Sequence, residues 1–531
     1  MTVMIKPTPV AKPSARKPDA VRSQLRGSSL LLAGRLLSRA INLTAQLLIV
    51  RHLTTEDYGA FAYGLAVVAF CKGFSTLGLR RAVMRFIPIY HERGDYGRLW
   101  GTLVLMGLVV VATGAIVIGS VHGAPQVLER FVKDGGAPVN LLLVLVFLVP
   151  IEAIDEMLIA LFACFAHPKA IFYRKHVLAP VLKLTAVLLL VAFGADARFL
   201  AWGYLAAAGL GVALYLAILA RILDRDGTWS HMRASRRDVP VRELFGFALP
   251  LLTSSLVAVV MHSADTMILG YFHAASEVAR YRVVLPAATM NTIVIASFGL
   301  LYMPLAARLF ARNDIPGIND LYWRTAVWMA VLSFPVFAVT FSLARSVTLA
   351  LYGERYASSW ILLQLFSVAY YFGVTLGNNG LTLKVLGKIR YVVIVNVLAM
   401  LASVTLALVL IPRFGALGAA IATTISMVLH NILKQLGLCR ATGMRFIEWR
   451  YVPVYAVLVC AAAGLLLVQL FVSTSLYVLL PLACIVSLAV LMLTKHSLAV
   501  EDTFPELLRV PLLNRLLRSK HPKSAPTRRS L

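Results

Sequence analysis

The sequence predicts an all-α protein that crosses a membrane many times, and three observations lead to this fold class. First, 60% of the 531 residues are hydrophobic and only 14% are charged, whereas a soluble protein of this size carries about 25% charged residues. Second, the mean hydropathy is +0.81, and apolar segments long enough to cross the ~30 Å hydrocarbon core of a bilayer as helices recur from end to end. Third, the pattern of these segments is duplicated, which indicates two similar bundles within one chain.

The apolar segments predict about 14 transmembrane helices, most of them joined by loops of a few residues. The expected spans are 28–50, 58–79, 99–121, 139–163, 175–194, 199–221, 245–270, 280–304, 322–345, 359–382, 390–411, 415–438, 452–472 and 475–494. Residues 1–26 are rich in Pro, Lys and Arg and contain no apolar core. We therefore expect a disordered basic tail there and no cleavable signal.

An internal repeat divides the chain into two lobes. The stretch 27–50 aligns with 245–272, and HLTTEDYGAFAYG (52–64) aligns with FHAASEVARYRVV (272–284). Six expected helices separate the two copies, an even number, so both halves have the same topology in the membrane. This predicts two pseudo-symmetric six-helix lobes across a central cavity, a transporter's arrangement, followed by two C-terminal helices. The expected units are a basic tail (1–26), an N-lobe (27–223), a cytoplasmic linker (224–243), a C-lobe (244–440), helices 13 and 14 (441–495) and a second basic tail (496–531).

The placement of the basic residues explains the formal net charge of +27. With the N-terminus in the cytoplasm, roughly three quarters of the 51 Lys and Arg residues fall in the tails and in cytoplasmic loops such as 221–242 and 434–450, as the positive-inside rule requires. We therefore expect cytoplasmic termini and no nucleic-acid partner. The five cysteines are scattered without metal-binding or redox spacing, so no metal or cofactor is expected.

The first apolar segment carries a polar stripe. Arg35, Arg39, Asn42 and Gln46 are spaced i, i+4, i+7 and i+11, which places them on one face of a helix. A charge at the centre of a bilayer costs about 2.5–3.5 kcal/mol by the mildest scale, unless it faces a partner or a wet cavity. The stripe therefore predicts that the first helix borders the cavity between the lobes.

Several ordered motifs resemble those of polysaccharide-transport flippases, the Wzx-like O-antigen flippases among them. RHLTTEDYGAFAYG (51–64) and GFSTLGLRRAVMRFIP (73–88) are similar to the start of these proteins. LYGERYASSWILLQLFS (351–367) and the stretch 387–426 are similar to their second bundle. The resemblance covers roughly residues 25–495. The same superfamily contains multidrug-and-toxin extruders (MATE-like fold) and peptidoglycan lipid flippases.

The resemblance implies a flippase that moves an oligosaccharide on a polyprenyl pyrophosphate across the bacterial inner membrane by alternating access. It implies a role in O-antigen, capsule or exopolysaccharide (lipopolysaccharide-type) biosynthesis, among membrane lipids and beside glycosyltransferases, a polymerase and an export apparatus. Two alternatives share the fold: a cation-coupled multidrug extruder, whose cavity would be acidic or aromatic, and a peptidoglycan lipid-precursor flippase. We expect no enzymatic activity, because the sequence shows no catalytic constellation with a supporting scaffold and no phosphate-binding loop.

Cationic residues within the expected helices of the N-lobe are the candidate binding groups. They are Arg35, Arg39, Lys72 and Lys183. Given the resemblance, they predict a cationic pocket for the pyrophosphate, with Asn42 and Gln46 beside it. Two other arrangements stay open. The long side chains could reach the headgroup region, or three carboxylates spaced for one face of the fourth helix, Glu152, Asp155 and Glu156, could neutralise them as fixed pairs.

The C-lobe is expected to be less charged within the membrane. Its first helix carries His262 and Asp265, and its fourth carries Asn378 and Asn379. His262 could couple transport to protons, because imidazole titrates near neutrality, or it could be a hydrogen-bonded packing group. Asp265 could couple a cation or could be solvated near the outer end of its helix. The adjacent Asn pair could unwind its helix locally or pack against other polar groups.

Overall fold

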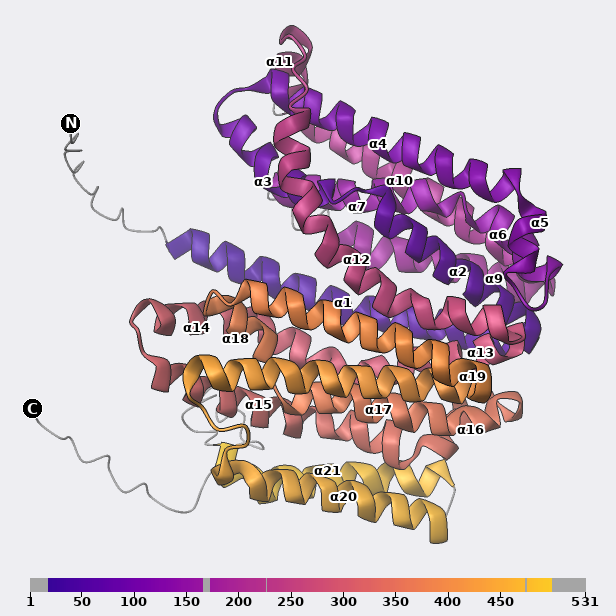
Figure 1. Cartoon of the computed structure of the whole chain (residues 1–531), viewed down its shortest axis with the longest axis vertical. Coiled ribbons are helices and arrows are strands. Elements are labelled where there is room, and N and C mark those ends of the chain that lie inside the picture. The colour runs from indigo at the N-terminus through magenta and orange to yellow at the C-terminus, as the bar shows by residue number, and fades with distance from the viewer. Residues whose placement is uncertain (1–17, 166–171, 226, 473–474, 499–531) are drawn as a thin grey trace, which may run out of the picture.

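Helices make up the described structure. The computed structural model describes residues 18–165, 172–225, 227–472 and 475–498. These residues form α-, π- and 3₁₀-helices and no strand (Figure 1). The prediction of an all-α membrane protein is confirmed. Most of the two expected tails lies outside the described residues.

The first lobe is built from the helices before residue 226. They are α1 (Pro18–His52), α2 (Thr55–Ser75), α3 (Leu79–Glu92), α4 (Tyr96–Gly123), α5 (Pro125–Arg130), α6 (Gly136–Leu145), α7 (Leu148–Cys164), the π-helix η1 (Phe172–Leu178), α9 (Ala179–Phe193) and α10 (Ala197–Arg225). Gly34 lets α1 approach η1 closely, because a Cβ at this position would lie 2.8 Å from the ring of Phe172. The polar helix α1 is thereby fixed along the inner side of the lobe.

The second lobe follows a short linker helix, α11 (Thr228–Ala234). Its helices are α12 (Val241–Phe272), α13 (Ala275–Thr289), η2 (Met290–Thr292), α14 (Ile293–Ala311), α15 (Ile315–Phe337), η3 (Ala338–Ser342), α16 (Ala344–Tyr352), η4 (Glu354–Ser359), α17 (Trp360–Thr375), α18 (Asn379–Val385) and α19 (Ile389–Thr442). After it come η5 (Trp449–Tyr451), α20 (Val452–Phe471) and α21 (Leu476–Leu498).

The two lobes occupy opposite halves of the molecule. In Figure 1 most indigo-to-magenta helices of the first lobe fill the upper half and most of the second lobe lies below, with α20 and α21 at the lower end. The helix α1 lies in the middle, and α12 begins in the upper half beside α3 and crosses to the second lobe. The long helices run roughly alongside one another, so their ends form two opposite faces. The chain enters α1 and leaves α21 on the same face, which we call the terminal face.

Length and apolar composition identify 11 membrane-spanning helices among the described residues, or 12 when α6 and α7, bent by 40°, count as one span. The helix α1 is not among them, because its polar stripe lowers its apolar content. The helix α19 counts once, although Gly415 has non-helical dihedral angles (φ 54°, ψ −132°) and separates two expected spans. The number of 14 spans therefore stays a prediction.

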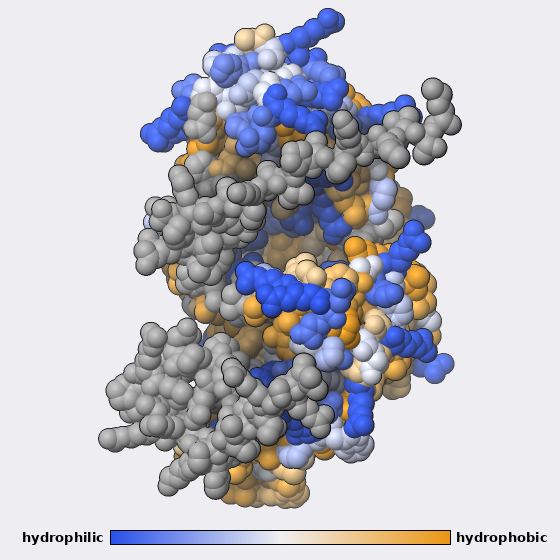
Figure 2. All heavy atoms as spheres, turned by 90° about the vertical axis from the view of Figure 1, so that its left-hand side faces the viewer, coloured by the Kyte–Doolittle hydropathy of each residue, from blue (hydrophilic) through white to orange (hydrophobic). Residues whose placement is uncertain are grey.

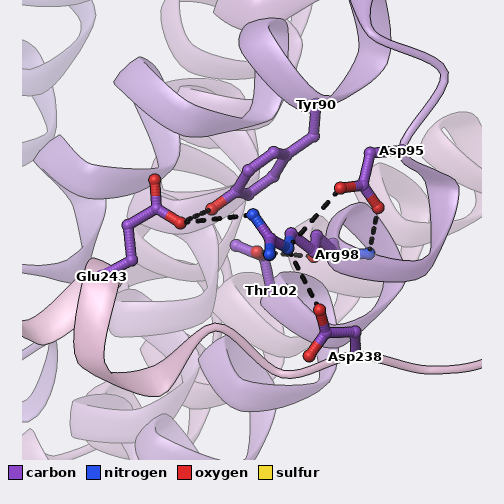
Figure 3. Close-up of polar contacts among 6 residues, drawn as sticks. All are labelled: Tyr90, Asp95, Arg98, Thr102, Asp238 and Glu243. Carbon is purple, nitrogen blue, oxygen red and sulfur yellow. Dashed lines mark hydrogen bonds and ion pairs between the residues drawn. The ribbon is translucent and has the colours of Figure 1, made fainter.

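The linker between the lobes is held against α4 on the terminal face (Figure 3). Arg98 Nε donates to Asp238 of the linker at 3.0 Å, and Arg98 Nη1 lies 3.9 Å from Glu243 at the start of α12. The Tyr90 hydroxyl donates to Glu243 at 2.9 Å. Burial and this carboxylate raise the pKa of Tyr90, so the hydroxyl stays protonated and remains a donor. These contacts fasten the beginning of α12 to the first lobe.

Two glycines of α4 make this attachment sterically possible. A Cβ on Gly101 would lie 1.9 Å from the carbonyl oxygen of Asp238, and a Cβ on Gly97 would lie 2.5 Å from that of Arg236. The Asp238 amide donates to the Gly97 carbonyl at 3.3 Å. The linker backbone therefore rests directly on the backbone of α4.

We predict that Gly101→Ala displaces the linker and destabilises the protein by about 1–3 kcal/mol, the usual cost of overpacking. The matched control is Gly107→Ala on the same helix, where an added Cβ meets no atom within 4 Å and stability should be unchanged or slightly raised. The measurement is the thermal unfolding temperature of the purified full-length protein in detergent. Equal unfolding temperatures for the two variants would contradict the close approach of linker and helix.

Candidate functional site

A cavity of about 930 Å³ lies between the two lobes. The first lobe contributes residues of α1, α2, α9 and α10, and the second contributes residues of α12, α13, α17 and α19. Figure 2 looks onto the terminal face and shows a hollow between the lobes with hydrophilic atoms in its depth. The cavity is therefore reached from the terminal face.

The first lobe places four of the six residues expected to bind substrate on the cavity wall. They are Arg39, Asn42, Gln46 and Lys183. Gln46 Nε2 donates to the Tyr58 hydroxyl at 3.1 Å and to the Val283 carbonyl at 3.2 Å, so this amide also joins the two lobes. The Lys183 ammonium lies 5.2 Å from the ring centre of Tyr204. This cation–π contact orients the ammonium without neutralising its charge.

Arg35 and Lys72, the other two expected residues, lie outside the cavity lining. The Arg35 side chain is exposed. Lys72 Nζ lies 3.0 Å from Glu152 Oε2 and 3.2 Å from Glu156 Oε1. Two carboxylates therefore neutralise this ammonium in the structure, and a role of Lys72 in substrate binding stays a prediction.

Asp155 pairs with Arg174, which lies between the expected spans 139–163 and 175–194. Its Oδ1 lies 2.8 Å from Arg174 Nη2, and Arg174 Nε donates to the Gly211 carbonyl at 3.0 Å. Arg174 is buried in η1, and a Cβ on Gly211 would lie 2.5 Å from its Nη2. The three carboxylates of α7 are thus all paired with cations of the first lobe. None of the three lines the cavity.

His262 and Asp265 occupy different environments on α12. His262 lines the cavity with an exposed side chain. Asp265 is 2% exposed and accepts hydrogen bonds from the hydroxyls of Thr423 at 2.6 Å and Tyr281 at 3.2 Å. The alternative of a solvated Asp265 is therefore wrong. The carboxylate lies behind a wall that Tyr281 and Thr423 form, and ion coupling by either residue stays a prediction.

The second lobe adds basic residues to the wall that sequence reasoning missed: Arg282 of α13, and His430 and Lys434 of α19. Lys434 lies near the end of the expected span 415–438 and is also counted with the basic loop 434–450, whereas α19 continues to Thr442 and keeps it within the helix. The signal for Arg282 was present in the sequence. Glu277 is the nearest acidic residue, and it pairs with Arg280 one turn later. Arg282 is therefore left without an acidic partner on its own helix.

The cavity lining is cationic. Among its described residues are the cations Arg39, Lys183, Arg282 and Lys434 and the imidazoles of His262 and His430, with no Asp or Glu. The ion pairs of the described chain involve none of these four cations. Uncompensated positive charge in a cavity of low dielectric attracts an anion strongly. The described residues contain no cluster of His, Cys, Asp or Glu suited to a metal ion.

An arginine clasp, formed by Arg51 and Arg355, joins the lobes on the face opposite the terminal face. Arg51 at the end of α1 donates to the carbonyls of Ala350 at 2.6 Å and Leu351 at 3.1 Å. Arg355 donates in return to the carbonyls of Leu53 at 3.0 Å and Arg51 at 3.3 Å. Each guanidinium thus binds carbonyls at the C-terminal end of a helix of the other lobe, where a cation is favoured. The clasp therefore ties the two lobes together on this face.

Comparisons of the sequence with known proteins show which family the chain resembles. Residues 24–310, more than half of the chain, match the family described as polysaccharide biosynthesis protein. An uncharacterized membrane protein of Methanocaldococcus jannaschii is 20% identical over 447 residues, 82% of this chain and 87% of its own length.

Solved structures show the same fold. The lipid II flippase MurJ in an inward closed conformation has a TM-score of 0.64 at 13% identity, covering 89% of this chain and 99% of its own. A multidrug resistance MATE family transporter of the MOP superfamily in an inward-facing conformation has a TM-score of 0.61 at 13% identity, covering 77% and 96%. The chain therefore has the fold of the transporters of this superfamily.

We predict that Lys72→Met destabilises the protein by about 2 kcal/mol, because it leaves Glu152 and Glu156 adjacent without a cation. Adding Glu152→Gln should restore part of the lost stability, since one of the two carboxylates is then removed. The measurement is the unfolding temperature in detergent over the double-mutant cycle. A Lys72→Met variant that unfolds at the wild-type temperature would argue against a structural pair.

Proposed function

Because the chain belongs to the polysaccharide biosynthesis protein family, we propose that it is a flippase for an oligosaccharide linked to a polyprenyl pyrophosphate. The protein lies in a bacterial inner membrane in this proposal, with its termini and its terminal face in the cytoplasm. The oligosaccharide is a unit of O-antigen, capsule or exopolysaccharide. Glycosyltransferases on the cytoplasmic side supply it, and a polymerase and an export apparatus consume it.

The observation that supports this proposal most directly is the charge of the cavity. A pyrophosphate presents two adjacent anionic groups, and Arg39 and Lys183 on one lobe and Arg282 on the other offer unpaired cations on the wall. Hydrogen bonds to charged groups are worth about 1.5–3 kcal/mol each. A multidrug extruder of the same fold takes up cationic substrates, which this lining would repel, so the cavity disfavours that alternative.

The two faces of the molecule suit alternating access. The cavity opens on the terminal face, and the arginine clasp ties the lobes together on the opposite face. Transport requires that the clasp separate and that the lobes approach each other on the terminal face. Because the clasp consists of hydrogen bonds from arginine side chains to neutral backbone carbonyls, breaking it does not separate a pair of opposite charges.

We predict that Arg39→Gln and Lys183→Gln each lower the transport efficiency about 10- to 100-fold, because each removes one charged hydrogen-bond donor to the pyrophosphate. The assay measures flipping of a fluorescent polyprenyl-pyrophosphate oligosaccharide by the full-length protein in proteoliposomes. The matched control is Arg130→Gln, which removes one exposed cation from α5, away from the cavity. Wild-type rates in both cavity variants, or uptake of a lipophilic cation by the wild type, would contradict the proposal.

We predict that the double variant Arg51→Gln/Arg355→Gln opens the outer face, because the charged donors of the clasp are lost. A cysteine at Leu285 on the cavity wall, in a chain whose five native cysteines are replaced by serine, reports the change. Its labelling by a membrane-impermeant maleimide added outside intact cells should rise about tenfold. The control is Arg345→Gln, an exposed arginine of the neighbouring helix α16. An unchanged labelling rate in the double variant would show that the clasp does not hold the lobes together.

A further inference from the structure

A second, smaller cavity of about 320 Å³ is lined by residues of the second lobe and adjoins the main one. The two cavities share wall residues, namely Thr292, Tyr370, Met427 and Lys434. The volume is at the lower end of small-molecule sites, about 300–1,000 Å³. The two cavities therefore lie side by side, and we call the smaller one the side pocket.

The side pocket is lined by amides where α17 gives way to α18. Gly377, at a φ of 69° that favours glycine, ends α17 and is followed at once by Asn378 and Asn379. The Asn379 Oδ1 accepts from the Gly380 amide at 2.6 Å, and its Nδ2 donates to the Asn431 carbonyl at 3.4 Å. These bonds orient the Asn379 amide, and Asn378 Nδ2 donates to Met329 Sδ at 3.9 Å. Both side chains are buried, with 4–5% exposure, and the donors and acceptors that stay free suit sugar hydroxyls.

Glycines bring the polar groups of α19 close to this break. A Cβ on Gly373 would lie 3.2 Å from Asn431 Nδ2, and a Cβ on Gly380 would lie 3.6 Å from Lys434 Nζ. The absence of side chains at these two positions leaves the Asn431 amide and the Lys434 ammonium facing the pocket. The backbone break and the two glycines therefore create a polar recess within an apolar lobe.

Two ammonium groups line this recess, that of the half-buried Lys434 and that of Lys384, whose side chain is exposed at the mouth. The lining includes no Asp or Glu among the described residues, and the ion pairs of the described chain do not involve either lysine. Two like charges on one small pocket repel each other, and this repulsion is relieved when an anion binds between them. Lys384 does not line the main cavity, so the pyrophosphate site leaves its charge unused.

We propose that the side pocket binds a carboxylate-bearing sugar of the transported oligosaccharide, so that the substrate class is an acidic glycan. This inference rests on the proposed function and adds a second anionic contact to it. The ammonium groups bind the carboxylate, the three asparagine amides bind the hydroxyls, and Tyr370 at the junction of the two cavities offers a ring face to the sugar. An anionic lipid headgroup would share the charge, but it would leave the amides largely unused.

The test compares two soluble probes on the full-length protein in nanodiscs of phosphatidylcholine. One probe is a glucose trisaccharide that ends in glucuronic acid, and the other is its neutral counterpart. We expect the acidic probe to bind about tenfold more tightly. Lys384→Gln should abolish this preference, and the matched control Lys388→Gln, an exposed lysine four residues later that lines neither cavity, should retain it.

Each outcome decides the inference. Equal affinity of the two probes in the wild type, or a preference that survives Lys384→Gln at an unchanged unfolding temperature, overturns it. Loss of the preference in nanodiscs that contain phosphatidylglycerol assigns the pocket to a lipid headgroup and also overturns it. Inorganic pyrophosphate, added separately, tests the main cavity. Its failure to bind the wild type would count against the proposed function, whereas the trisaccharide comparison would still decide the side pocket.

Discussion

The structure depends on one constraint: a charged side chain within a bilayer must find an opposite charge or a wet space. This constraint sorts the basic residues of the chain into two groups. Lys72 and Arg174 find carboxylates of α7 and are fixed inside the first lobe. Arg39 and Arg282 find none and face the cavity, and Lys183 faces it within electrostatic reach of Glu152 and Asp155 but without a direct ion pair. The distinction between a structural charge and a binding charge therefore follows from the position of a single acidic helix.

The same constraint governs the clasped face of the molecule. The arginine clasp uses backbone carbonyls at helix ends in place of carboxylates. A carboxylate there would bind each guanidinium more tightly and would leave an unpaired anion whenever the lobes separate. Carbonyls, in contrast, return to water at little cost, because they carry no net charge. In the proposed flippase, this weaker and neutral partner suits a contact that has to open repeatedly.

The sequence predicted those parts of the site in which neighbouring residues lie on the same helix. It did not predict contacts between helices. The stripe of α1 is local, so its spacing correctly indicated that Arg39, Asn42 and Gln46 share a face toward the cavity. The partner of Lys72 lies on α7, and its distance could not be read from spacing along the chain. Lys434 was missed because it was counted with the basic loop 434–450, although it also falls inside the expected span 415–438 and α19 continues to Thr442. A few residues decide whether a lysine lies in water or within a lobe.

The distribution of cations over both lobes has a consequence for transport. With the cavity empty, the unpaired cations of the first lobe face Arg282 and Lys434 of the second, and their repulsion opposes closure of the lobes on the terminal face. An anionic substrate between them removes this repulsion, so it stabilises the closed arrangement more than the open one. A ligand shifts a conformational equilibrium only through such a difference. In the proposed flippase, the charge that recognises the substrate therefore also makes closure depend on its presence.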